Sequence, residues 1–143
     1  EVYLNYAEAL FEATGNPNFT GDWNGKRYDM SPVAAVNAVR ARSFMQGLDE
    51  NIDETSFRTR LRNERRVELA FEDHRFWDVR RWMIAPETLG APLRGVEITK
   101  ISDEEFEYKP IEVEKRTFEP KMYLYPIPQA DLNTTGWVQN PLW

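Results

Sequence analysis

Four carboxylates in the middle of the chain have the residue type and spacing that acid–base chemistry requires. Glu64, Glu68 and Glu72 repeat every four residues, and Asp78 follows them. Two carboxylates can hydrolyse a glycosidic bond when one donates a proton and the other acts as base or nucleophile. Glu64 or Glu68 acting together with Asp78 would therefore make a glycosidase.

Arginines at helical spacing from these carboxylates argue against catalysis. Residues three or four apart on a helix form ion pairs, and the spacing predicts four of them: Arg60–Glu64, Arg65–Glu68, Glu72–Arg75 and Asp78–Arg81. A neighbouring guanidinium lowers the pKa of a carboxyl group, whereas a general acid needs a raised pKa. We therefore interpret these side chains as a structural network and predict no catalytic residue.

The single histidine, His74, belongs to the same stretch. A metal site needs several ligands at fixed spacing, and Glu72 and His74 would point to different sides of a helix. We expect no metal and no cofactor, and we predict that backbone or arginine partners hold His74 at a helix junction.

Aromatic residues alternate with arginines just after His74. Such mixtures can stack on sugars or bases, but buried aromatic side chains dominate protein cores. We therefore predict that the aromatic residues Phe76, Trp77 and Trp82 lie in the core. The arginines Arg75, Arg80 and Arg81 are predicted to pack over them.

The segment 16–28 is the better candidate for ligand binding. It holds Trp23 and Tyr28 among Asn, Asp and Gly residues. Sugar rings stack on aromatic side chains while polar groups hold their hydroxyls, and binding residues often sit on loops over a rigid scaffold. A loop that folds onto its own aromatic residues is the alternative interpretation.

Composition excludes several classes of protein. The 143 residues carry a net charge of −6, so a general nucleic-acid binder is not expected. There is no cysteine for disulfide or thiolate chemistry. The first residue is Glu1, already within a helical pattern, and we expect any targeting signal to lie upstream.

Hydrophobic periodicity predicts helices in the first part of the chain. One helix is expected from Val2 to Thr14, a second from Ser31-Pro32 to Gly47, and a third from Asp53 to Trp82 or Met83, with a break near Asp73-His74. The inner side of the third helix is predicted to carry Phe57, Leu61, Val67 or Glu68, and Phe71.

The remaining chain has a different character. A β-hairpin is expected from residues 96–101 and 108–118, and the tail 134–143 is expected to be irregular chain held by aromatic side chains. The fold class is therefore mainly α, with tetratricopeptide-like helical hairpins, a small β-hairpin and an irregular C-terminal segment. We expect a single domain over 1–143, helical over 1–84 and β-hairpin or irregular over 85–143.

Several sequence blocks, in order along the whole chain, resemble the SusD/RagB family. They are NYAEALFEATG (5–15), AVNAVRAR (35–42), RNERRVELAFEDHRFWDVRRW (62–82), KMYLYPIPQADL (121–132) and the ending QNPLW (139–143). The resemblance covers the C-terminal portion of such proteins. One departure is Asp73, which stands where a Gly is common before His-Arg.

The resemblance implies a surface-exposed outer-membrane lipoprotein of the Bacteroidetes type that is not an enzyme. Such a protein captures glycan or another nutrient and delivers it to a TonB-dependent, SusC-like transporter. Its lipid anchor would lie outside this chain, and this segment would act mainly as scaffold. In an alternative hypothesis, the segment is a protein-interaction module that contacts the transporter without touching ligand.

Overall fold

The computed structural model describes all 143 residues. The chain forms two compact units, Glu1–Arg75 and Phe76–Trp143. Its first element is helix α1 (Val2–Thr14). Gly15 ends α1 in the left-handed conformation that glycine adopts without steric cost. A short hairpin follows, with β1 (Gly21–Trp23) antiparallel to β2 (Lys26–Tyr28). The sequence interpretation of this region as plain loop is therefore wrong.

Helices α2 (Pro32–Arg42) and α3 (Glu54–Glu68) both begin at residues that cap them. The Ser31 hydroxyl accepts a hydrogen bond from the Ala34 amide at 3.1 Å, and the Asp53 carboxylate accepts one from the Ser56 amide at 3.0 Å. Each side chain satisfies a backbone donor that the first turn leaves unpaired. Helix α2 ends well before Gly47, because the exposed Phe44 turns the backbone to a positive φ of 55°.

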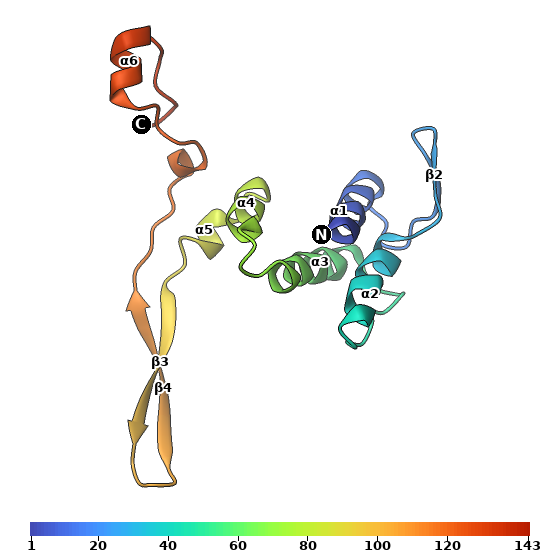
Figure 1. The fold of residues 1–143 in the computed structure, drawn as a ribbon, viewed down its shortest axis with the longest axis horizontal. Coiled ribbons are helices and arrows are strands. Elements are labelled where there is room, and N and C mark those ends of the chain that lie inside the picture. The colour runs from blue at the N-terminus through green and yellow to red at the C-terminus, as the bar shows by residue number, and fades with distance from the viewer. The chain divides into compact units, whose positions relative to one another are not determined.

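The core of the first unit lies among α1, α2 and α3 (Figure 1). Phe11 of α1 and Phe57 of α3 meet edge to face with ring centroids 4.9 Å apart, and both are fully buried. The core comprises Leu4, Ala7, Phe11, Val33, Ala35, Val36, Val39, Phe57 and Leu61. Fully burying an aliphatic or aromatic side chain contributes about 1.5–3 kcal/mol, so this cluster is the main stabilising element of the unit.

The third predicted helix is two helices in the structure. Helix α3 stops at Glu68, and α4 (His74–Arg81) starts after a turn in which Phe71 and Asp73 have φ values of 65° and 61°. Phe71 is fully exposed and Val67 is largely exposed, so their predicted place on the inner side is wrong. The predicted break at Asp73-His74 is confirmed, and Asp73 takes the left-handed conformation that glycine would adopt more easily.

The second unit contains a longer hairpin. After α5 (Ala85–Thr88), strand β3 (Leu93–Lys100) pairs antiparallel with β4 (Phe106–Glu114). The predicted hairpin is confirmed, but its strands begin two or three residues earlier than the predicted 96–101 and 108–118 and the second ends four residues earlier. A 3₁₀ helix (Pro120–Tyr123) and a short helix, α6 (Gln129–Thr135), follow. Six helices and two small antiparallel hairpins confirm a mainly α fold with small β elements. No helix combines the length and the apolar character needed to cross a bilayer.

Amide and indole side chains hold the C-terminal tail to the segment 121–127. Gln139 accepts from the Ile127 amide at 2.8 Å and donates to the Ile127 carbonyl at 3.0 Å. The Asn140 side chain donates to the Tyr125 carbonyl at 2.6 Å. The Trp143 indole donates to the carbonyls of Lys121 and Leu124, both at 3.0 Å. These contacts give the KMYLYPI and QNPLW blocks a common structural role.

Candidate functional site

The β1–β2 hairpin positions Trp23 beside α1. Asn24 and Gly25 form its turn with φ values of 47° and 75°, both in the left-handed region. A two-residue turn of this kind matches the twist of a hairpin and favours Asn-Gly. Trp23 pairs with Lys26 across the turn, and its ring meets that of Phe19 edge to face at 6.2 Å.

Tyr28 ends strand β2 and faces Tyr6 of α1. Their ring centroids are 6.2 Å apart with the planes tilted by 41°. The Tyr6 hydroxyl donates to the Met30 carbonyl at 2.6 Å. Burial raises the pKa of Tyr6, and Tyr28 and Asp29 raise it further, so this phenol stays protonated at neutral pH.

Two hollows meet at this tyrosine pair. One, of about 260 Å³, is lined by Tyr6, Ala9, Leu10, Ala13, Trp23, Asn24, Lys26 and Tyr28. The other, of about 490 Å³, is lined by Val2, Tyr3, Tyr6, Arg27, Tyr28, Asp29 and Met30. Tyr6 and Tyr28 belong to both, so their rings form a shared wall.

The two hollows offer aromatic faces next to a few polar groups. Trp23 is 43% exposed and Tyr28 is half-buried. The Asn24 amide and the Lys26 ammonium can hydrogen-bond hydroxyls, and Arg27 pairs with Asp29 at 2.8 Å at the rim of the second hollow. Such a site can bind a ring with an apolar face and polar edges.

Tyr6 was missed from the sequence, although the two predicted residues, Trp23 and Tyr28, do line one hollow with it. Tyr6 lies 22 residues before Tyr28 in the sequence. The hydrophobic pattern of its helix is accounted for by the residues on the buried side, so it gave no reason to assign Tyr6 to a binding site. Only packing of the hairpin against α1 brings the two rings together. The Asn24-Gly25 pair is the sequence signal that would have placed the hairpin.

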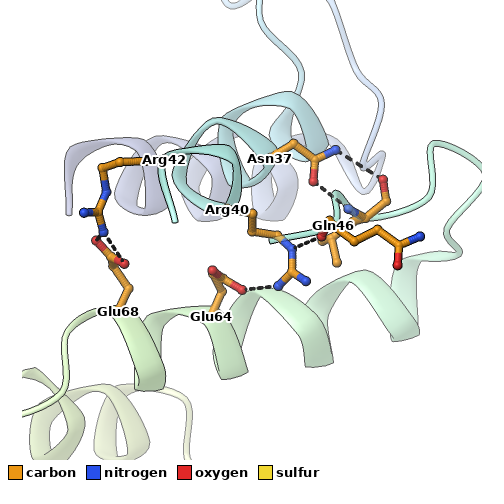
Figure 2. A network of polar contacts seen from close by, with 7 residues as sticks. Asn37, Arg40, Arg42, Gln46, Glu64 and Glu68 are labelled. Carbon is orange, nitrogen blue, oxygen red and sulfur yellow. Dashed lines mark hydrogen bonds and ion pairs between the residues drawn. The ribbon is translucent and has the colours of Figure 1, made fainter. Parts of the chain in front are cut away.

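The central carboxylates are held by arginines of a different helix. In Figure 2, Arg40 and Arg42 of α2 reach Glu64 and Glu68 of α3. Arg40 donates to Glu64 at 2.6 Å, and Arg42 donates to both oxygens of Glu68 at 2.7 and 2.9 Å. The predicted partners Arg60 for Glu64 and Arg65 for Glu68 are therefore wrong, because the ion pairs cross between helices.

Arg65 ties α3 to α1. It is 3% exposed, donates to the Asn5 side chain at 2.6 Å and lies 3.6 Å from a carboxylate oxygen of Glu8. Its predicted pairing along its own helix fails for the same reason as that of Glu64: buried charges on α3 face the neighbouring helices.

The remaining predicted network residues lie in and around α4. The predicted pair forms between Arg81 and the buried Asp78 at 2.8 Å, whereas Glu72 is exposed. His74 Nε2 lies 3.6 Å from a carboxylate oxygen of Glu1, not beside an arginine, and Arg75 is half-buried.

Trp77 is not a core residue in this structure. It is 59% exposed and meets Phe76 edge to face at 5.1 Å. Its predicted burial is wrong because the inward positions of α4 belong to Asp78 and Val79. The predicted packing of arginines over aromatic rings does occur, with Arg80 over Phe76 and Arg81 over Trp82, each 4.9 Å from the ring centroid.

Comparison with known proteins identifies the family. No group of three His, Cys, Asp or Glu side chains lies close enough together to hold a metal ion. A search of curated proteins gave no match. The family model described as the SusD family, SusD_RagB, matches residues 1–143. The chain therefore belongs to the SusD family, and membership in this family indicates glycan or nutrient binding in outer-membrane uptake.

Proposed function

We propose that this chain is part of a non-catalytic protein that captures a glycan at the outer-membrane surface and delivers it to a TonB-dependent transporter. Family membership supports the binding role and the association with the outer membrane. The lipid anchor and surface exposure belong to the proposal. So do the expectations that residues 1–143 form one domain and that the helices follow a tetratricopeptide-like plan.

The tyrosine pair and Trp23 are the observation that carries the glycan assignment. Three aromatic rings converge on one hollow, and the hydroxyl hydrogen of Tyr6 is already used by the Met30 carbonyl. Tyr6 therefore offers its ring, while Asn24 and Lys26 are available for hydroxyl groups. A sugar ring has this combination of an apolar C–H face and a polar periphery.

The carboxylates belong to the scaffold in this proposal. Glu64 pairs with Arg40 and Glu68 with Arg42, and neither lines the aromatic hollow. A carboxylate fixed by a guanidinium is a poor general acid. Glu68→Gln should therefore leave glycan binding unchanged.

Calorimetry of the full-length protein against a panel of oligosaccharides tests the assignment. Trp23→Ala and Tyr28→Ala should each weaken binding about tenfold, equivalent to ~1.4 kcal/mol. Trp137→Ala is the matched control, because Trp137 is an exposed tryptophan in the other unit. Wild-type affinity in both pocket variants would place the ligand elsewhere, and binding of peptide in place of every glycan would contradict the glycan assignment.

A second candidate function is contact with the transporter by a segment that touches no ligand. The apolar surface left uncovered on the β3–β4 hairpin favours it. Removal of this hairpin from the full-length protein should then abolish transporter binding while sparing glycan binding. Retained transporter binding would count against the role.

A further inference from the structure

The register of β3 and β4 sorts their side chains onto two different faces. Directly opposed residues of an antiparallel pair point to the same side, and successive pairs alternate. Val96 opposes Pro110, Ile98 opposes Tyr108, and Lys100 opposes Phe106. These pairs share one face, which also carries Lys100 and, farther from the turn, the pair Arg94–Glu112. We call its apolar side chains the apolar hairpin face: Val96, Ile98, Phe106, Tyr108 and Pro110.

The opposite side of the ribbon is polar in the half near the turn, whereas farther from the turn it carries the apolar Ile111, which opposes Gly95. It presents the pair Glu97–Lys109 and the pair Thr99–Glu107. Over residues 96–99 and 106–110, apolar residues therefore alternate with polar ones, as in sheets that cover something on one side only. On the apolar hairpin face, however, Ile98 is 60% exposed and Tyr108 is 65% exposed.

A lone two-stranded hairpin with one bare apolar face is marginally stable in water. In Figure 1 the two strands lie side by side as a ribbon, and each pairs only with the other. Pro110 has no N–H, so β4 is a poor template for adding another strand. The attractive surface is therefore the face and not the edge.

Charge around the hairpin restricts what can cover that face. Residues 93–114 carry three basic and seven acidic side chains, a net charge of −4. Acidic residues gather at the turn end, where Asp103, Glu104, Glu105 and Glu107 are exposed. A second copy would bring −4 against −4, which disfavours self-association. A protein surface with an apolar centre and a rim of Lys and Arg complements both properties.

We propose that the apolar hairpin face is a docking surface for a protein partner whose contact patch is apolar and edged by Lys and Arg. Apolar burial supplies the affinity, and the acidic turn steers the approach. Taking the partner to be the transporter rests on the proposed function. The hairpin face itself is assigned from the register, exposure and charge of this chain.

The test measures binding of the full-length protein to its detergent-solubilised transporter. Ile98→Asn with Tyr108→Asn replaces one cross-strand pair on the apolar face. Glu97→Asn with Lys109→Asn replaces an adjacent pair on the polar face, at similar backbone cost and with no change in net charge. The first double variant should raise Kd at least tenfold, and the second should stay within about twofold of wild type.

A charge variant tests the steering step separately. Glu104→Lys with Glu105→Lys should slow association about tenfold at low salt and flatten its dependence on ionic strength. Unchanged association with unchanged salt dependence would overturn the role of the acidic turn. Because both residues lie in the exposed turn, this variant leaves the strand pairing in place.

Other outcomes separate the possible occupants. Equal transporter affinity in both Asn-pair variants would overturn the docking face while preserving the delivery function. No transporter binding by wild-type protein would overturn both. Protection of the Tyr108 side chain from surface labelling in the full-length protein alone would show that its own chain covers the face, and a dimer lost in the Ile98/Tyr108 variant would assign it to a second copy. Either result overturns the proposal.

Discussion

Arg40 of α2 donates a 2.6 Å hydrogen bond from Nη1 to Oε2 of Glu64 on α3, and both side chains are mostly buried. The same guanidinium donates through Nε to the Gln46 carbonyl at 2.7 Å. Arg40 therefore links the next helix to the loop that follows its own (Figure 2). A buried pair of this kind fixes geometry, because removing either partner leaves an uncompensated charge.

Glu64→Ala should be among the most destabilising single substitutions on α3. It leaves Arg40 buried without its carboxylate, which costs about 3–5 kcal/mol. Urea unfolding measures the loss. Glu68→Ala is the control: its partner Arg42 is 66% exposed, so the cost should be about 0–1 kcal/mol. Replacing Arg40 and Glu64 together by Met and Leu should restore most of the stability, and a double variant no better than Glu64→Ala would contradict this account.

Phe57→Ala and Trp77→Ala should differ widely in effect. Phe57 is fully buried against Phe11, so truncation should cost about 3–5 kcal/mol. Trp77 is largely exposed, and its truncation should cost about 1 kcal/mol or less. Thermal unfolding monitored by circular dichroism compares the two. An equal loss in both variants would show that Trp77 is buried in the folded protein.

The Glu12–Arg58 pair should make stability depend on pH in the acid range. Arg58 donates to both Glu12 oxygens at 3.0 Å, and this hydrogen bonding lowers the pKa of Glu12 below its usual 4.5. The folded state therefore binds fewer protons than the unfolded state. The contribution is fully present above pH 4.5 and is lost as pH falls through the lower folded pKa.

Comparison of wild type with Glu12→Gln over pH 2–7, a range of about five units around the usual carboxyl pKa, measures this linkage. The stability difference should be largest at neutral pH and should vanish in acid. In an Arg58→Ala background the pH dependence of that difference should be lost. A difference that grows as pH falls would have the wrong sign for a carboxylate held by arginine.

Gln139→Ala should loosen the C-terminal tail. The substitution removes both hydrogen bonds to the Ile127 backbone, and each unmet buried group costs about 1–3 kcal/mol. Hydrogen exchange at the Ile127 amide should accelerate at least tenfold. Gln129→Ala is the matched control, because its side chain bonds only to Asn133 on the exposed α6. Unchanged exchange at Ile127 would show that Trp143 and Asn140 hold the tail without Gln139.

The sequence predicted what local chemistry decides. Helix α1 and the starts of α2 and α3 follow from Gly15, Ser31 and Asp53, whose effects act within one turn. The β3–β4 hairpin follows from alternation and β-branched residues. The break near Asp73-His74 was predicted as well, and the structure places Asp73 there at a φ of 61°.

Tertiary structure alone decided the partners of charged and aromatic side chains. Spacing along α3 places Arg60 one helical turn from Glu64. The buried face of α3 packs against α2, however, so Glu64 forms its ion pair with Arg40 of α2. Tyr6 of α1 and Tyr28 of β2 meet with ring centroids 6.2 Å apart, although they lie on different elements. Trp77 was assigned to the core by residue type, yet the phase of α4 turns Asp78 and Val79 inward. Periodicity gives the face on which a residue lies, but only packing determines which neighbour meets that face.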